Sequence, residues 1–144
     1  MRAGDQTREK IKRTAEALFA ERGFNAVSIR DILEAAEQRN TGSLHYYFRT
    51  KEALARELVA DGVRRIDEDR SRRLDRMEAQ GGPKNMREAI ELLAYPYFVD
   101  DDYMRFLSRL MQDNYGLFLE GAKNLDAGFH RLAGIRFEDG RDVA

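Results

Sequence analysis

The sequence predicts an all-α protein, and three observations support this fold class. Apolar residues recur at spacings of three and four along most of the 144-residue chain, as on the buried face of a helix. No stretch keeps the alternation of a half-buried strand. Gly and Pro are few, at 11 and 2 residues, so long irregular stretches are not expected. The expected organisation is a three-helix N-terminal domain over residues 1–50 and a helical domain over residues 51–144, joined by a long helix.

The first helix is expected over residues 7–22. Its apolar positions follow the i, i+4, i+7, i+8 pattern of one buried stripe: Ile11, Ala15, Leu18 and Phe19. Gly23 follows as a residue that can take a positive φ without a Cβ penalty, which predicts the end of this helix. Phe24 and Val27 should fold back onto the same core.

A second helix is expected to begin at Ser28. The Ser28 hydroxyl can cap a free backbone N–H, and Asp31 stands three residues later, as in a capping box with a shorter acid. The buried side of this helix is expected to carry Ile29, Ile32, Leu33 and Ala36. The polar residues 37–40 break the pattern.

A short third helix is expected over residues 41–47, with Leu44 and Phe48 facing inward. Thr50 is expected to cap a fourth helix that extends as far as Gln80. The charged run 64–78 mixes both signs at helical spacing, which indicates a solvated face rather than a binding tail.

The remaining chain predicts three more helical segments. Gly81-Gly82-Pro83 is the clearest breaker, and a helix over residues 84–95 should follow and be ended or kinked by Pro96. An acidic turn at residues 100–102 precedes a helix expected over 103–120. A weak last helix is expected over 125–135, and residues 137–144 look frayed.

Composition narrows the function classes. The chain has no Cys, which excludes disulfides, thiolate metal sites and Cys nucleophiles. No apolar run approaches the roughly 20 residues that span a bilayer, and no signal peptide is seen, so a cytoplasmic location with no membrane partner is the expectation. The net charge is −1, but residues 1–60 hold 11 basic and 9 acidic residues and residues 61–144 hold 14 and 17. The sign of this asymmetry suits a DNA-binding head on an acidic body.

Residues 28–48 have the organisation of a helix-turn-helix. Two short helices separated by a polar turn follow a longer helix, and the second short helix must be polar outward to enter a major groove about 12 Å wide. Its outward side chains are short or planar hydrogen-bonding groups: Arg39, Asn40, Thr41, Ser43, His45, Tyr46 and Tyr47.

At these residues the chain resembles the DNA-binding head of the tetracycline-repressor (TetR) family. The resemblance covers about the first 58 residues and lies in separate pieces in the same order: Ile11-x3-Ala15-x2-Leu18-Phe19-x3-Gly23-Phe24, Val27-Ser28-Ile29-Arg30-Asp31-Ile32, Gly42-Ser43-Leu44-x2-Tyr47-Phe48 and Lys51-Glu52-x-Leu54. The turn before Gly42 is one residue longer than the family's commonest form. Glu37 replaces a usual Gly, and His45 stands where Tyr is commoner.

The resemblance implies a sequence-specific transcriptional regulator. Ser28 would place the start of the second helix against a phosphate, and Tyr47 and Lys51 would hold phosphates on the other side. The groove-facing set would be Arg39, Asn40, Thr41, Ser43, His45 and Tyr46. The implied partner is near-palindromic double-stranded operator DNA bound by a homodimer, and the implied action is repression that a small-molecule effector releases. No cofactor is implied.

Two readings of the aromatic and Met residues of the C-terminal part remain open. They can form a simple helical core, or an effector pocket with apolar walls and a few hydroxyls. The pocket reading would use Tyr95, Phe98, Phe106, Met111 and Tyr115, from a group that also includes Tyr97, Tyr103 and Phe118.

Alternatives to the DNA-binding reading are weaker. His45 has only His130 as a possible partner in a metal site, which disfavours that role. Tyr46 and Tyr47 could stack on single-stranded bases, but a position at the rim of the domain with Phe48 in the core is favoured. An enzyme is the weakest class, because no Ser/His/Asp order, glycine-rich phosphate loop or His/Glu metal spacing is present.

The C-terminal part is short for the family, whose last two helices usually form the dimer interface. Either the helices from Tyr103 onward make the dimer, or dimerisation is poor. The competing hypothesis is a truncated protein-interaction module that pairs with a related regulator.

Overall fold

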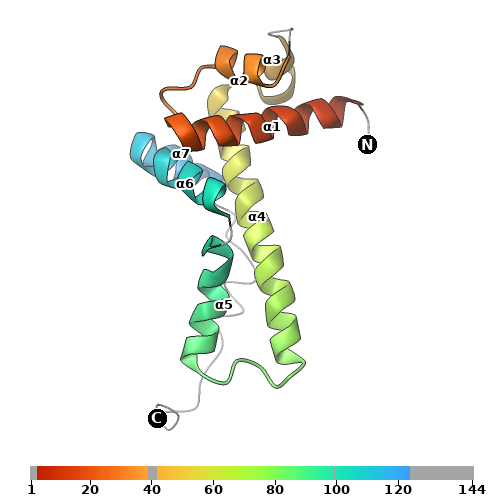
Figure 1. Cartoon of the computed structure of the whole chain (residues 1–144), viewed down its shortest axis with the longest axis vertical. Helices are drawn as coiled ribbons and strands as arrows, with labels where there is room; N and C mark the ends of the chain where they lie inside the picture. The colour runs from red at the N-terminus through yellow and green to blue at the C-terminus, as the bar shows by residue number, and fades with distance from the viewer. Residues whose placement is uncertain (1–2, 39–41, 99, 124–144) are drawn as a thin grey trace. The chain divides into compact units, whose positions relative to one another are not determined.

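The computed structural model describes residues 3–38, 42–98 and 100–123, and over these residues the chain is all-α (Figure 1). The predicted fold class is confirmed. The helices have these bounds: α1 (Ala3–Arg22), α2 (Ile29–Ala35), α3 (Gly42–Phe48), α4 (Lys51–Glu78), α5 (Met86–Phe98), α6 (Asp101–Asp113) and α7 (Tyr115–Gly121).

The described residues form two compact units that divide the chain differently from the expected boundary at residue 50. The first unit contains residues 3–62 and 101–123, and the second contains residues 63–100. Helix α4 runs through both. The reason is tertiary packing: α6 lies against α1, so two helices that come late in the sequence complete the core of the N-terminal one.

Helix α1 presents the predicted stripe to the core of the first unit. Ile11, Ala15 and Phe19 are fully buried and Leu18 is nearly so. The helix begins at Ala3, four residues earlier than expected, with Asp5 in its first turn, where a negative charge suits the helix dipole. Gly23 ends it as predicted, with φ of 88° and its N–H bonded to the Phe19 carbonyl at 2.9 Å.

Helix α6 packs on α1 and α4 through aromatic rings. The buried Phe106 ring stacks on Phe19 with centroids 5.9 Å apart, and Tyr103 is also fully buried. The Tyr103 hydroxyl donates to the Val59 carbonyl of α4 at 2.9 Å. The Tyr103 side chain lies against Gly62, where a Cβ would approach two ring carbons and the hydroxyl oxygen to well under 3.0 Å. This close approach therefore depends on the absence of a side chain at residue 62.

The predicted single helix over residues 103–120 is wrong, because the structure has two helices there. Helix α6 begins at Asp101, with Asp101 and Asp102 in its first turn, where the acidic residues are stabilised by the helix dipole. Asn114 leaves the helical conformation and caps α7, since its side chain accepts from the Leu117 N–H at 3.1 Å. The α7 helix then reaches α4 through Gly121, where a Cβ would lie 2.6 Å from the Val59 Cβ.

The second unit is a helical hairpin of the later turns of α4 and of α5. Leu74 and Leu92 form its buried cluster, with Met77 and Leu93 packed against it. Helix α4 ends at Glu78 rather than Gln80, and Gly81 and Gly82 both take positive φ in the connection. Arg65 of α4 also forms an ion pair at 3.1 Å with Asp100, which follows α5 in the chain.

Helix α5 runs from Met86 to Phe98, so the expectation that Pro96 ends the helix after Tyr95 is wrong. Pro96 has no N–H to donate to the carbonyl four residues earlier, yet the helix continues for two residues beyond it.

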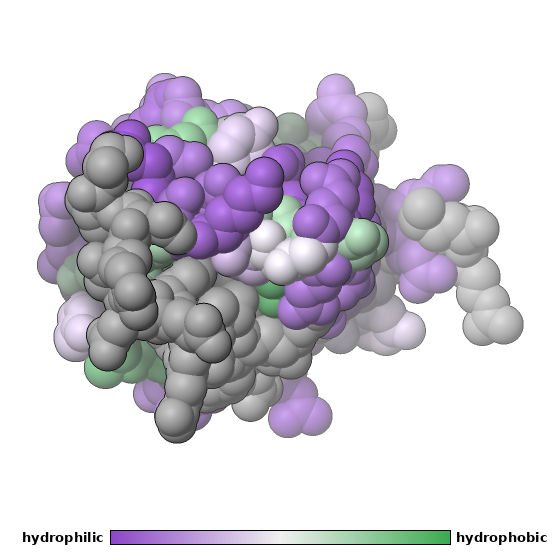
Figure 2. All heavy atoms as spheres, turned by 90° about the horizontal axis from the view of Figure 1, so that it is seen from below, coloured by the Kyte–Doolittle hydropathy of each residue, from purple (hydrophilic) through white to green (hydrophobic). Residues whose placement is uncertain are grey.

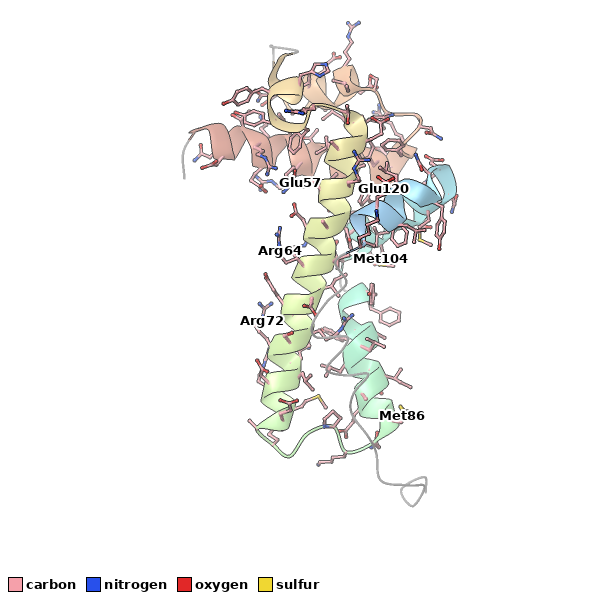
Figure 3. All side chains as sticks on the ribbon, turned by 180° about the vertical axis from the view of Figure 1, so that it is seen from behind. Glu57, Arg64, Arg72, Met86, Met104 and Glu120 are labelled. Carbon is pink, nitrogen blue, oxygen red and sulfur yellow. The ribbon has the colours of Figure 1, made fainter. Side chains whose placement is uncertain are left out.

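The charged run 64–78 is largely exposed. Arg64 and Arg72, labelled on α4 in Figure 3, are both exposed, whereas Arg70 is buried. On the face drawn in Figure 2, most of the coloured surface is hydrophilic. None of the helices in the described ranges is long and apolar enough to cross a bilayer. The expected helix over 125–135 and the tail 137–144 lie outside the described residues.

Candidate nucleic-acid interface

The start of α2 is a complete capping box, as the sequence predicts. The Asp31 N–H donates to the Ser28 hydroxyl at 3.1 Å, and the Ser28 N–H donates to the Asp31 carboxylate at 2.8 Å. The Ser28 hydroxyl also donates to this carboxylate at 2.6 Å. These hydrogen bonds from the Ser28 side chain and backbone lower the pKa of Asp31, and the charges of Arg22 and Arg30 act in the same direction. The cap holds Ser28 in extended backbone at the surface.

The end of α2 has the hydrogen bonds of a Schellman motif. The Gln38 N–H bonds to the Leu33 carbonyl at 2.8 Å, and the Glu37 N–H bonds to the Glu34 carbonyl at 3.0 Å. Glu37 takes φ of 57°, a conformation that favours glycine, and so the structure shows why a Gly is usual here. The Glu37 carboxylate accepts from Lys10 of α1 at 2.5 Å, and this hydrogen bond with the Lys10 charge lowers the pKa of Glu37.

Helix α3 exposes aromatic and imidazole groups. Tyr46 is 82% exposed, and its ring meets Tyr47 edge-on at 4.9 Å. His45 is exposed, and its Nδ1 lies 2.8 Å from the Arg49 carbonyl. Because a carbonyl only accepts, Nδ1 carries a proton in this bond, which leaves Nε2 of a neutral ring as an acceptor. The predicted core position of Phe48 is confirmed, since its ring is 4% exposed and lies under the Arg8 guanidinium at 4.9 Å.

Helix α4 begins directly after α3. Thr50 caps it as predicted, accepting from the Ala53 N–H at 3.0 Å. The half-buried Lys51 side chain turns back toward the α1–α2 connection. Its Nζ donates to the Phe24 and Val27 carbonyls, each at 2.9 Å, and lies 4.2 Å from the centre of the Phe24 ring.

A cluster of charges behind this surface joins α1 to α4. Lys12 is 8% exposed and forms ion pairs with Glu57 at 3.3 Å and with Asp61. Arg8 pairs with the same Glu57, which Figure 3 labels on α4. Burial alone would lower the pKa of Lys12, but the hydrogen bond and charge of Asp61 and the charges of Glu57 and Glu9 outweigh it and raise the pKa. Lys12 therefore stays charged although it is buried between α1 and α4.

The α1–α2 connection is also held from α6. The Asn25 N–H donates to the Asp113 carboxylate at 3.1 Å, and a Cβ on Gly23 would lie 2.9 Å from the same oxygen. Sequence reasoning missed Asp113, Lys12 and Asp61 as determinants of this surface. Lys12 and Asp61 pair across 49 residues, and Asp113 and Asn25 across 88, and no local pattern marks such pairs.

The structure brings together five of the nine residues predicted to bind DNA, all in the first unit. Ser28 caps the start of α2. His45, Tyr46 and Tyr47 lie on α3, and Lys51 is the first residue of α4. The Tyr47 hydroxyl lies near α1, since a Cβ on Gly4 would be 3.4 Å from it. Arg39, Asn40 and Thr41 lie outside the described residues, as does the side chain of Ser43.

The five residues of the predicted effector pocket divide between the units. Phe106, Met111 and Tyr115 belong to the first unit, where Phe106 is core and the other two are exposed. Tyr95 and Phe98 belong to the second, where Phe98 is 78% exposed.

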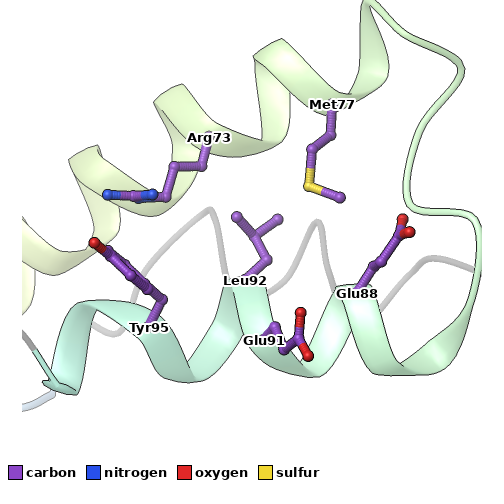
Figure 4. A pocket seen from close by; sticks show the side chains of 6 residues that line it. All are labelled: Arg73, Met77, Glu88, Glu91, Leu92 and Tyr95. Carbon is purple, nitrogen blue, oxygen red and sulfur yellow. The ribbon is translucent and has the colours of Figure 1, made fainter.

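A cavity of about 200 Å³ lies within the hairpin of the second unit (Figure 4). Of the predicted pocket residues described here, Tyr95 lines it, with its ring 4.0 Å from the Arg73 guanidinium. The other described lining residues are Met77, Glu88, Glu91 and Leu92. Among the residues that the structure describes, no group of His, Asp and Glu could hold a metal ion.

A capped α2, a short exposed α3 and a supporting α1 define a helix-turn-helix domain of the kind that binds DNA. Residues 11–58, about a third of the chain, match the family model described as "Bacterial regulatory proteins, tetR family". The resemblance to this family of DNA-binding regulators, noted from the motifs, is thus confirmed over these residues.

Two known proteins illustrate the similarity. The "HTH-type transcriptional repressor KstR2" of Mycolicibacterium smegmatis (strain ATCC 700084 / mc(2)155) is 35% identical over 54 residues, which are 38% of this chain and 26% of that relative. A solved structure described as "Molecular basis for control of antibiotic production by a bacterial hormones" has a TM-score of 0.59 at 21% identity, covering 89% of this chain and 78% of the other. The chain thus matches about a quarter of the length of its curated relative, and the solved structure supports the fold alone.

Proposed function

We propose that this protein is a sequence-specific transcriptional repressor that inserts α3 into the major groove of operator DNA. The observation that carries the proposal is the pairing of a short exposed α3 with an α2 fixed at both ends by local hydrogen bonds. A reading helix must be held in register by its neighbours, because a misplacement of about 1 Å breaks hydrogen bonds to base edges. The curated relative is named a transcriptional repressor, which supports repression rather than activation as the direction of regulation.

Two sets of contacts are proposed for this head. The groove-facing set is Arg39, Asn40, Thr41, Ser43, His45 and Tyr46, and the phosphate-contacting set that the resemblance implies is Ser28, Tyr47 and Lys51. In the first set, His45 has a defined chemical preference. With Nδ1 bonded to the Arg49 carbonyl, its Nε2 can accept from an exocyclic amino group of adenine or cytosine in the major groove.

The regulated form is proposed to be a cytoplasmic homodimer on a near-palindromic site, with half-sites one helical turn or a multiple apart. A small-molecule effector would release the dimer from DNA. It would bind more tightly to a conformation in which the spacing of the two DNA-binding domains does not match the half-sites. The predicted effector residues Tyr95, Phe98, Phe106, Met111 and Tyr115 remain a proposal. Its support is the cavity beside Tyr95, which is lined by the apolar side chains of Leu92 and Met77 and by the carboxylates of Glu88 and Glu91.

The test combines light scattering of the full chain with gel shifts on duplexes selected from a random-sequence pool. A dimer that enriches one near-palindrome and loses affinity steeply with salt supports the repressor, since each phosphate contact adds about 0.9 to the salt slope. A monomer that enriches no sequence contradicts it and favours the interaction module. Lipophilic compounds that release the selected duplex would identify the effector class.

A further inference from the structure

Lys51 occupies an unusual electrostatic position. It is the first residue of α4, where the unpaired N–H groups of the helix create a partial positive charge that disfavours a cation. Two carbonyl oxygens, of Phe24 and Val27, accept from its ammonium group, and the Phe24 ring face lies beside it. The side chain is thus bound within the domain on several sides.

The two carbonyls belong to the short connection that leads into the capping box. Phe24 and Val27 are buried at 3% and 1% exposure, and Ser28 follows Val27 directly. Asp113 holds the same connection by accepting from the Asn25 N–H. The connection is therefore fixed by a cation from α4 and an anion from α6, and its carbonyls need a donor because buried polar groups without partners are costly.

We infer that Lys51 is a positioning residue that fixes the α1–α2 connection, and with it Ser28 and α2, rather than a residue that holds a DNA phosphate. This inference rests on the proposed DNA binding and refines the assignment of one contact. An ammonium group has three donors, and two are directed at backbone carbonyls. Lys51 would thus affect DNA binding indirectly. Its loss would release α2 and would not remove a positive charge from the protein surface that faces the DNA.

The test compares Lys51→Met, which keeps an unbranched stem and removes every donor, with Arg49→Met. The control removes one positive charge two residues away, from an exposed side chain. Amide hydrogen exchange of residues 24–28 is measured by NMR in the free full-length chain. Binding to a duplex selected with the wild-type chain is then measured between 50 and 200 mM salt, a range over which phosphate contacts dominate the change.

For Lys51→Met we expect exchange at residues 24–28 to rise by about tenfold or more, because two hydrogen bonds to a charged donor are lost. We expect its affinity to fall while its salt slope equals that of the wild type. Arg49→Met should leave exchange at residues 24–28 unchanged. Unchanged exchange in Lys51→Met, or a salt slope reduced by about 0.9, would overturn the inference.

Lys51→Gln provides a second variant if Lys51→Met does not fold. Its amide can donate to one carbonyl without carrying a charge, so exchange at residues 24–28 should be faster than in the wild type. Wild-type exchange together with a reduced salt slope would again favour the phosphate contact. If the wild type selects no duplex, the proposed function fails, but the exchange measurements still decide the role of Lys51 in the fold.

Discussion

Replacing Gly62 with alanine would place a methyl group against the ring of Tyr103. The built Cβ approaches ring carbons and the hydroxyl of Tyr103 to well under 3.0 Å, a separation that real Cβ atoms essentially never show. Tyr103 has no room to withdraw, because it is fully buried and its hydroxyl is bonded to the Val59 carbonyl. Either α6 moves away from α4 or the ring leaves its site.

The expected cost follows from three contributions. Overpacking of a filled core costs up to about 3 kcal/mol, and losing the Tyr103 hydrogen bond costs about 1 kcal/mol. The higher helix propensity of alanine returns about 1 kcal/mol. The net loss in the free energy of unfolding is therefore about 3 kcal/mol, a large part of the 5–15 kcal/mol typical of a folded domain.

Urea unfolding followed by circular dichroism measures this loss. Gly116→Ala is the matched control, because it is also a helical glycine but its Cβ would meet Asn114 Oδ1 at 3.7 Å, an ordinary contact. We expect Gly116→Ala to be neutral or slightly stabilising. In Gly62→Ala/Tyr103→Leu, the cost of the alanine should nearly vanish. A Gly62→Ala single variant as stable as the wild type would refute the close-packing argument.

Four further predictions concern the helix-turn-helix domain. Ser28→Ala should cost about 1 kcal/mol through loss of the cap, seen as a lower urea midpoint, and an unchanged midpoint would contradict the capping role. The pKa of Asp31 is lowered in the folded chain, so its contribution to stability is present above the ordinary value of about 3.9 and is lost as pH falls through the lowered value; acid titrations should show Asp31→Asn lacking this loss. Glu37→Gly should raise the urea midpoint, because a positive φ strains glutamate and not glycine, and a drop would mean that the Lys10 ion pair outweighs the strain. His45→Phe should weaken discrimination at one base pair by about 1–3 kcal/mol without changing the salt slope, and an unchanged base preference in duplex selection would exclude His45 from the readout.

The features predicted correctly from the sequence depend on neighbouring residues. The caps at Ser28 and Thr50 and the positive φ of Gly23 involve partners within four positions, so the sequence contains their whole signal. The buried stripe of α1 is likewise visible in the sequence, because its apolar residues recur at spacings of three and four.

The features that were missed depend on tertiary structure or on weak local signals. Asn114 interrupts an otherwise continuous apolar pattern, and a single Asn within such a run does not by itself predict a new helix. The packing of α6 on α1 joins residues some 87 positions apart, such as Phe19 and Phe106, and no periodicity predicts it. Lys51 looks like a free cation in the sequence, and only the folded connection provides its two carbonyl acceptors.

The packing of α6 on α1 affects whether the helix-turn-helix domain can be transferred to another protein. The family match ends at residue 58, but Tyr103, Phe106 and Leu110 supply fully buried side chains to the unit that contains it. A chain cut after residue 62 would expose Phe19 and leave Asn25 without its Asp113 acceptor. We therefore expect the DNA-binding head to be unable to fold as a transplanted fragment, so that fusions designed to borrow its specificity must carry residues 101–123 with it.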